Sequence, residues 1–204
     1  MELGELDRSA LFGREGPLEI ELGSGAGRFL WERALAHPEL DFVGLEIREP
    51  LVEHRMARPD RPKNLVYLVA NANRNLALAK PGVIQQFHVH FPDPCFRGRH
   101  FKRRVIQSST VREMATLLPL GGRIYAQSDV LLLAEEMFRV LSAETALSAL
   151  LPADLQAPRP IPEATEWELH HEAVAEPIYR MLFEKQREPS GETPNVVLGP
   201  VKPV

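Results

Sequence analysis

Short runs rich in apolar residues alternate with helical repeats along the chain from Pro17 to about Leu150. The runs predict strands, and the segments between them repeat apolar residues at helical spacing. The predicted strands are 18–22, 41–47, 65–69, 83–90 and 123–127, and the predicted helices cover about 29–35, 50–58, 105–118 and 131–141. Because strands that alternate with helices form parallel βαβ units, we expect an α/β fold: an open, mostly parallel sheet with helices on both faces.

The two ends of the chain lie outside this alternation. Residues 1–16 precede the first strand, and residues 189–204 form a proline-rich, loosely held tail, so we expect one domain over 17–188. The 204 residues, 44% of them hydrophobic, suffice for one core. No apolar run approaches the roughly 20 residues of a membrane helix, no signal peptide is evident, and the single cysteine, Cys95, excludes an internal disulfide. We therefore expect a cytoplasmic protein without a membrane partner.

A glycine-rich loop joins the first predicted strand to the first predicted helix. Residues 21–27 are Glu-Leu-Gly-Ser-Gly-Ala-Gly, and Arg28 follows where a dinucleotide fingerprint requires a further glycine. Glycines allow a sharp turn and a close approach of the backbone to a ligand. The nearby carboxylates favour a cationic ligand, and Glu46, at the end of the second strand, can accept the two hydroxyls of a ribose. S-adenosylmethionine fits this pattern, with Glu21, Gly23, Gly25 and Glu46 as its candidate binding residues.

The fourth predicted strand ends at an acid held between two prolines. Asp93 stands between Pro92 and Pro94, whose rings fix the backbone angle φ. Its carboxylate is therefore expected on a stiff turn at the carboxyl end of the sheet, where ligands bind in open α/β folds.

Positive charge is concentrated just after this turn. Residues 97–104 hold five Lys or Arg and one His without an acid, in a chain with 24 basic and 28 acidic residues and a net charge of −4. Without these five charges the rest of the chain carries −9. The overall balance excludes a protein that is basic throughout, but the local cluster is typical of a phosphate-binding patch. A solvated charge run at the start of a helix is the alternative, although cations there oppose the helix dipole.

Two histidine pairs raise the question of a metal. His88 and His90 alternate on one strand, and His170 and His171 are adjacent near the end of the domain. Two ligands do not complete a zinc site. We expect packing or hydrogen-bonding roles for the first pair, a surface or RNA-facing position for the second, and no metal.

The run FPDPCFRGRHFKRR at 91–104 resembles the FPDPWxKxRHxKRR signature of the bacterial tRNA (guanine-N7-)-methyltransferases. Further motifs similar to this family occur in its order. They are Glu-Leu-Gly-Ser-Gly at 21–25, Gly-Leu-Glu at 44–46, Ser128-Asp129, Thr-Glu-Trp-Glu at 165–168 and Leu-Phe-Glu-Lys at 182–185. The likeness covers residues 17 to 185. It implies a Rossmann-like class I methyltransferase domain over 17–188 that methylates N7 of guanine 46 in the tRNA variable loop.

The resemblance also implies roles for individual residues. It assigns S-adenosylmethionine binding to Glu21, Gly23, Gly25, Glu46, Asn71 and Asp93, with Asp93 also the catalytic-site acid. It assigns contact with the target nucleoside to Arg97, Asp129, Thr165, Glu166, Trp167 and Glu168. It assigns binding of the RNA backbone to Arg99, His100, Lys102, Arg103 and Arg104. The implied partner is tRNA, and we expect a monomer or a homodimer.

The chain departs from the family pattern at several positions. Asn71 replaces an aspartate, Cys95 a tryptophan and Arg97 a lysine, and residues 169–172 replace an arginine-rich stretch. Two alternatives therefore stay open. One is a non-catalytic RNA-binding or complex-forming subunit on the same fold. The other is a methyltransferase for another RNA or a small molecule, although a small molecule offers no phosphate backbone to the basic cluster.

Overall fold

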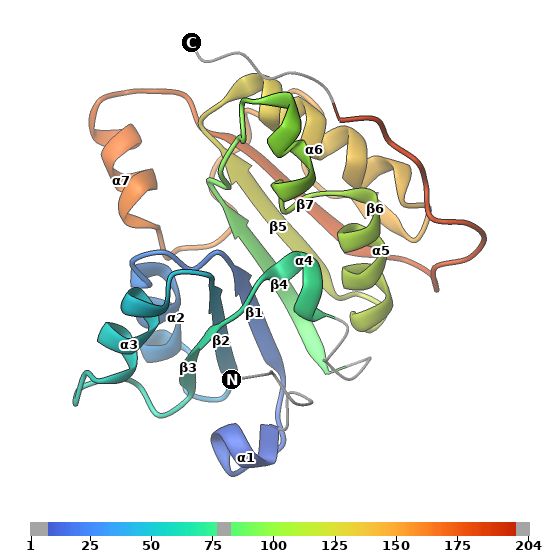
Figure 1. Cartoon of the computed structure of the whole chain (residues 1–204). Coiled ribbons are helices and arrows are strands. Elements are labelled where there is room, and N and C mark those ends of the chain that lie inside the picture. Colours follow the sequence, from blue (N-terminus) through green and yellow to red (C-terminus); the bar gives the residue numbers. More distant parts are fainter. Residues whose placement is uncertain (1–7, 77–82, 199–204) are drawn as a thin grey trace.

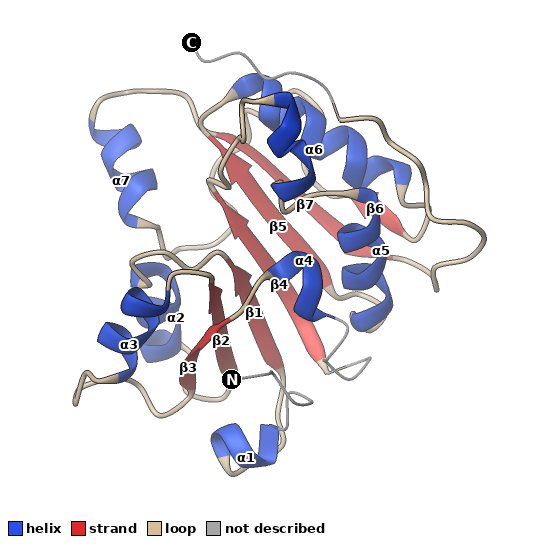
Figure 2. Cartoon of the chain, viewed as in Figure 1, coloured by secondary structure: helices blue, strands red, loops and turns tan. Residues whose placement is uncertain are grey.

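One seven-stranded sheet forms the centre of the structure, a computed structural model that describes residues 8–76 and 83–198. Its order is β3-β2-β1-β4-β5-β7-β6 (Figures 1 and 2). The strands are β1 (Leu18–Leu22), β2 (Asp41–Glu46), β3 (Leu65–Val69), β4 (Ile84–His90), β5 (Arg123–Ser128), β6 (Leu147–Ala149) and β7 (Tyr179–Lys185). Strands β1 to β5 are parallel, and β7 runs antiparallel to both of its neighbours. The five predicted strands and the mostly parallel sheet are confirmed; β6 and β7 were not predicted.

Helices cover both faces of the sheet, as predicted. In Figures 1 and 2, α2 (Arg28–Ala36) and α3 (Glu49–Met56) lie on one face, and α4 (Ala72–Asn75), α5 (Ser108–Leu117) and α6 (Leu131–Ala143) lie on the other. The short α1 (Arg8–Phe12) precedes β1, and α7 (Glu166–Ala173) stands beyond the strand ends on the side of α2. The helix expected from residue 105 begins at Ser108, because a separate 3-10 helix, η2 (Gly98–Arg103), precedes it. No helix in the described ranges has the length and apolarity to cross a membrane.

The two faces of β1 bury different kinds of side chain. Leu18, Ile20 and Leu22 join the larger apolar cluster, which includes α5 and α6, and burying each stabilises the fold by about 1.5–3 kcal/mol. Glu19 and Glu21 alternate with them on the opposite face and are buried as well. Buried carboxylates require hydrogen-bond or ion-pair partners. This requirement explains why polar side chains on the neighbouring elements point toward β1.

Glu19 finds its partners on α2 and β4. Arg33 Nη2 donates to Glu19 Oε1 at 2.7 Å, and His88 Nε2 lies 2.8 Å from Glu19 Oε2. Burial alone would raise the pKa of Glu19, but the hydrogen bonds from Arg33 and His88 outweigh it and lower the pKa to about 2. His88 therefore has the predicted hydrogen-bonding role.

The described parts of the two terminal segments, 8–16 and 189–198, contact the domain. Arg14 Nη2 lies 2.7 Å from the Asp41 carboxylate. The tail forms no helix or strand over 189–198. Arg112 donates to the carbonyl of Glu192 at 3.1 Å, and Val196 packs against the core. Side chains of α5 and α6 bind the tail backbone within 189–198, and the expectation of a loosely held tail stays a prediction; residues 199–204 lie outside the described residues.

Candidate active site

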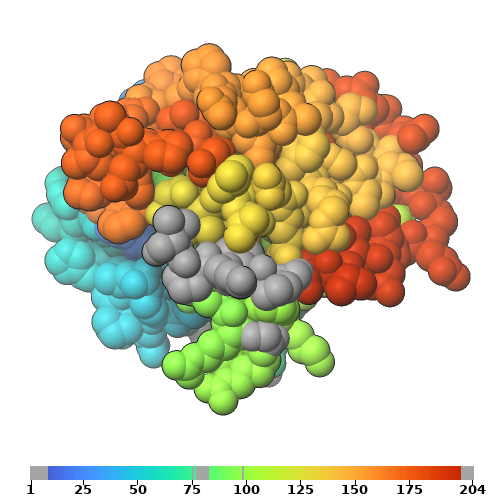
Figure 3. Space-filling view, turned by 90° about the horizontal axis from the view of Figure 1, so that it is seen from above, coloured from blue at the N-terminus to red at the C-terminus, as the bar shows by residue number. Residues whose placement is uncertain are grey.

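A cavity of about 370 Å³ opens at the carboxyl ends of β1 and β4, between the glycine loop and α7. Figure 3 views the molecule from above: α7 (orange) borders the blue and cyan segments, and the green segment around η2 projects at one edge. The cavity is lined by Glu21, Gly23, Ser24, Gly25, Ala26, Gly27, Arg28, Phe29, Arg48, His90, Phe91, Thr165, Glu166 and Trp167. It thus joins the predicted cofactor loop to the predicted nucleoside-binding segment of α7.

Hydrogen bonds to β2 hold the glycine loop in its turn. Gly23 N donates to the Leu45 carbonyl at 2.8 Å, and Gly25 N donates to Glu46 Oε2 at 2.9 Å. Three glycines of the loop have positive φ, from 52° at Gly25 to 84° at Gly23. Side chains rarely adopt this conformation, so the turn explains the glycine spacing.

Replacing Gly27 with alanine is expected to destabilise the protein more than the same change at Gly23. Both have similar left-handed φ angles, +82° and +84°. A Cβ at Gly27 would lie 2.7 Å from the Tyr67 hydroxyl, whereas one at Gly23 would meet nothing within 4 Å among the described residues. Gly27→Ala should lower the free energy of unfolding by about 2–3 kcal/mol and Gly23→Ala by about 1 kcal/mol. Chemical denaturation measures both, and equal losses would contradict the steric explanation.

Glu21 presents a buried carboxylate at the cavity. Its Oε1 lies 2.8 Å from His90 Nδ1 across the β1–β4 pair, and both side chains are buried. Its Oε2 has no hydrogen-bond partner in the described part of the chain. A buried carboxylate oxygen without a donor is costly, so this atom fits a cationic donor such as the ammonium group of S-adenosylmethionine. His90 holds the other oxygen, Oε1, and so helps to orient the carboxylate.

Glu46 presents a second carboxylate at the end of β2. It accepts hydrogen bonds from Gly25 N at 2.9 Å and from Arg48 Nε at 3.0 Å. Burial would raise the pKa of Glu46, but the hydrogen bonds from Arg48 and Gly25 outweigh it and lower the pKa. Arg48 and Gly25 N occupy both carboxylate oxygens and Glu46 does not line the cavity, so its contact with the two hydroxyls of a ribose stays a prediction. Arg48 was not predicted; its signal in the sequence is a cation two residues after the strand-end acid.

Asn71 and Asp93 lie at neighbouring strand ends but do not line the cavity. Asn71 caps α4, where its side chain accepts a hydrogen bond from Asn73 N at 3.0 Å. The exposed Asp93 accepts one from Cys95 N at 2.8 Å. Phe91 and Cys95 have positive φ, 46° and 45°, so the turn around Asp93 stores backbone strain, which is common at functional sites. Burial and the neighbouring Asp93 raise the pKa of the Cys95 thiol, which disfavours a reactive thiolate.

The basic segment after Asp93 is exposed except at its last residue. Arg97, Arg99, Lys102 and Arg103 are exposed and form no ion pair within 8–76 and 83–198, and His100 is half-buried. Arg104 is only 2% exposed, and its Nη1 lies 2.5 Å from Glu136 Oε1 on α6. The prediction that Arg104 holds the RNA backbone is therefore wrong, because a side chain paired in the interior cannot reach a phosphate.

The segment around α7 brings three of its four predicted residues to the cavity. Thr165, Glu166 and Trp167 line it, and the indole Nε1 of Trp167 donates to Asp129 Oδ2 at 3.3 Å. Glu168 is 1% exposed. Its carboxylate points into the protein interior, where it binds Arg180 and Gln127, and the predicted contact of Glu168 with the nucleoside stays a prediction.

His171 also departs from expectation. The ring stacks on Phe91 with 5.9 Å between centroids, and its Nε2 lies 3.4 Å from Asp129 Oδ2. It is buried, whereas His170 is exposed as expected. The described residues contain no group of three His, Cys, Asp or Glu placed to hold a metal ion.

The strand order, the antiparallel β7, the glycine loop and the two strand-end carboxylates together define a class I S-adenosylmethionine-dependent methyltransferase. A family model described as "Putative methyltransferase" matches residues 15–181. The chain is 40% identical to the tRNA (guanine-N(7)-)-methyltransferase of Synechococcus elongatus, over 83% of this chain and 82% of that protein. It is 41% identical to that of Thermosynechococcus vestitus, over 83% and 80%. The chain belongs to the tRNA (guanine-N(7)-)-methyltransferase family.

A solved structure supports the fold independently. The 16S rRNA (adenine(1408)-N(1))-methyltransferase from Catenulisporales acidiphilia superposes with a TM-score of 0.60 at 14% identity, over 92% of this chain and 96% of that one. At this identity the likeness concerns the fold alone, and it agrees with the Rossmann-like sheet described above.

Proposed function

We propose that this protein transfers a methyl group from S-adenosylmethionine to N7 of guanine 46 in the variable loop of tRNA. The observation that carries the proposal is a juxtaposition at the end of β4. A cavity with a carboxylate oxygen that has no donor among the described residues lies on one side of the Asp93 turn, and a strip of exposed cations that form no ion pair within 8–76 and 83–198 follows on the other. We call Arg97, Arg99, Lys102 and Arg103 the cation strip.

The chemistry requires little catalytic machinery. Guanine N7 has an in-plane lone pair and no proton, so the transfer needs orientation rather than a general base. S-adenosylmethionine, when bound, supplies the electrophilic methyl group. Glu21 and Glu46 would hold its ammonium and ribose, and the rings of Phe29 and His90, which meet edge to face, line the cavity.

Positive charge develops on the guanine as N7 is methylated. Asp93 and Asp129 lie at the ends of β4 and β5, and fixed carboxylates there stabilise that charge. The ring of Trp167 is 51% exposed beside the cavity. It offers an aromatic surface on which an unstacked base can lie, and it favours the cationic form through cation–π attraction.

The cation strip distinguishes an RNA substrate from a small one. Its side chains suit phosphates, and the rest of the chain is acidic and discourages indiscriminate adsorption of RNA. A non-catalytic RNA-binding subunit would use the same strip, but it would not require the unsatisfied Glu21 oxygen in the cavity.

The proposal is tested by incubating the protein with unmodified tRNA and labelled S-adenosylmethionine, followed by nucleoside analysis. We expect labelled 7-methylguanosine, and none with tRNA in which guanine 46 is replaced by adenine. A different methylated nucleoside would assign the enzyme to another target. An absence of methylation combined with no cofactor binding in calorimetry would favour the non-catalytic subunit.

Removing part of the cation strip is expected to weaken tRNA binding in a salt-dependent way. The double change Lys102→Gln and Arg103→Gln should reduce the slope of log affinity against log salt by about 1.4–1.8, since each phosphate contact contributes about 0.7–0.9. Cofactor affinity should not change. Arg123→Gln is the matched control, because this exposed arginine pairs with Glu184 at the opposite end of β5. Fluorescence anisotropy at several salt concentrations measures the slope, and an unchanged slope would exclude the strip as a phosphate site.

A further inference from the structure

We propose that Glu168 is a positioning residue that fixes α7 at the rim of the cavity through Arg180 and Gln127, and does not itself contact the nucleoside. The inference rests on the proposed function, since it assigns the geometry of the nucleoside side of that site. It differs from the role that the family resemblance implies for Glu168.

Helix α7 lacks the apolar anchor that normally holds a helix in place. It has eight residues, and its only buried side chains are Glu168 and His171. Its large apolar residues are exposed: Trp167 by 51% and Leu169 by 36%. A helix of two turns is marginal without tertiary contacts, so the position of α7 depends on its two buried residues: the polar contacts of Glu168 and the stacking of His171 on Phe91.

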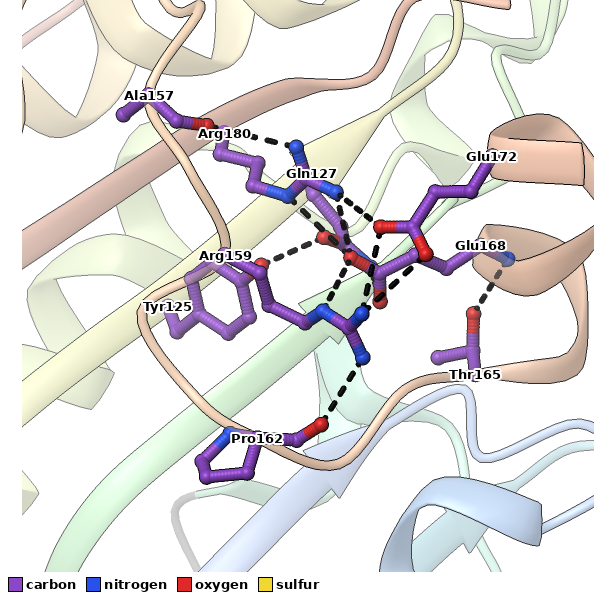
Figure 4. Close-up of polar contacts among 9 residues, drawn as sticks. All are labelled: Tyr125, Gln127, Ala157, Arg159, Pro162, Thr165, Glu168, Glu172 and Arg180. Atoms are coloured by element: carbon purple, nitrogen blue, oxygen red, sulfur yellow. Dashed lines mark hydrogen bonds and ion pairs between the residues drawn. The ribbon is translucent and has the colours of Figure 1, made fainter. Parts of the chain in front are cut away.

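The Glu168 carboxylate is held on both oxygens. Arg180 Nη2, from β7, donates to Oε1 at 2.7 Å, and Gln127 Nε2, from β5, donates to Oε2 at 3.1 Å (Figure 4). Gln127 is itself oriented by Tyr125, whose hydroxyl donates to Gln127 Oε1 at 2.6 Å. At the start of the helix the Glu168 amide donates to Thr165 Oγ1 at 3.0 Å.

A second arginine links this network to the segment that leads into α7. Arg159 donates to the Pro162 carbonyl at 2.9 Å and to Glu172 Oε2 at 3.2 Å (Figure 4). Arg180 also reaches Glu172 Oε1 at 3.2 Å. Two arginines and two glutamates therefore balance in charge, and they tie one face of α7 to β5, β7 and the preceding loop. Truncation of one of the four would leave an uncompensated charge in this network.

The network sets the distance between α7 and the nucleoside side of the cavity. Gln127 is two residues before Asp129 at the end of β5, and Trp167 is next to Glu168 on α7. The Glu168–Gln127 contact thus fixes the spacing at which Trp167 Nε1 reaches Asp129 Oδ2. Loss of the contact is expected to release α7 and with it the surface that Thr165, Glu166 and Trp167 present.

The protein contains two tryptophans, so a Trp31→Phe background leaves Trp167 as the only tryptophan and as a reporter of α7. In that background we compare Glu168→Gln, Arg180→Met and the double variant, with Glu184→Gln as control, a half-buried residue of β7 that pairs with Arg123 and not with α7. Acrylamide quenching of Trp167 fluorescence should rise about twofold in both single variants. It should not rise further in the double variant, because paired residues act as a unit. The control should match the background. Arg180→Lys, which keeps the charge but loses the guanidinium fork, replaces Arg180→Met if that variant does not fold.

Methylation gives the second readout. The kcat/KM for tRNA should fall by about 10- to 100-fold in each single variant and to the same level in the double variant, with S-adenosylmethionine affinity in calorimetry unchanged. Full activity of Arg180→Met beside an inactive Glu168→Gln would overturn the proposal, because it would show that Glu168 contacts the nucleoside directly. Unchanged quenching in both single variants would overturn it as well. If the parent protein methylates no tRNA, the proposed function fails, whereas the quenching experiment still decides the role of Glu168.

Discussion

Replacing Asp93 with alanine should lower the rate of methyl transfer by about 100- to 1000-fold, the usual effect of removing one preorganised charge-stabilising group. Affinity for tRNA should stay within about threefold, because phosphate contacts supply most of it. Asp93 is exposed, so the loss of its carboxylate leaves no cavity in the core. A radiolabelled methyl-transfer assay and anisotropy with unmodified tRNA measure the two effects.

Asparagine at position 93 distinguishes the effect of the charge from the effect of the side chain on the turn. The Asp93 carboxylate accepts a hydrogen bond from Cys95 N at 2.8 Å within a strained turn. An asparagine oxygen can accept the same hydrogen bond, so Asp93→Asn keeps the turn and removes only the charge. If Asp93→Asn retains full turnover, the carboxylate does not stabilise a cationic guanine and its role is to shape the turn.

Replacing Glu21 with glutamine should weaken S-adenosylmethionine binding by about 30- to 1000-fold, or about 2–4 kcal/mol. The amide oxygen of glutamine can still accept the hydrogen bond from His90 Nδ1, which is 2.8 Å from Glu21 Oε1. The other position then carries an NH₂ group, where the unsatisfied oxygen Oε2 now lies. A donor replaces an acceptor there, and the charge that attracts an ammonium group is lost. Isothermal titration calorimetry measures the affinity.

S-adenosylhomocysteine provides the matched ligand for this test. It keeps the ammonium group and lacks the sulfonium charge. If Glu21 binds the ammonium, both ligands lose affinity by the same factor. A loss confined to S-adenosylmethionine would place Glu21 against the sulfonium instead, and unchanged affinity for both would remove Glu21 from the cofactor site.

Local patterns predicted the elements nearest the cofactor. The glycine spacing at 23–27 and the apolar runs of β1 to β5 determine backbone conformation over a few residues. The ends of the observed strands fall within one residue of the predicted ones. The antiparallel β7 escaped prediction because it follows a long irregular segment and pairs with β5, more than fifty residues earlier in the chain. Its register depends on contacts that no local pattern encodes.

Residues that are adjacent in the sequence can have opposite roles, because the side chains of successive residues in a short helix point in different directions. Arg103 is exposed and Arg104 is buried against Glu136, although both belong to one run of cations. The same contrast holds for Trp167, which lines the cavity, and Glu168, which binds Arg180 behind it. Motif matching treats these pairs alike, because it does not record which way each side chain points.

The sequence by itself determined the sheet core, the glycine loop, the strand-end acids Glu21 and Glu46, and the concentration of positive charge after Asp93. These follow from periodicity, backbone freedom and charge, which act over short distances along the chain. Only the tertiary structure decided that one oxygen of Glu21 has no donor among the described residues, that Arg104 is buried against Glu136, and that Glu168 binds Arg180. The partners are far apart in the sequence: 12 residues for Glu168 and Arg180, 32 for Arg104 and Glu136, and 69 for Glu21 and His90. Burial therefore decides whether such a charge meets a ligand or a neighbour, and burial is a property of the packed fold.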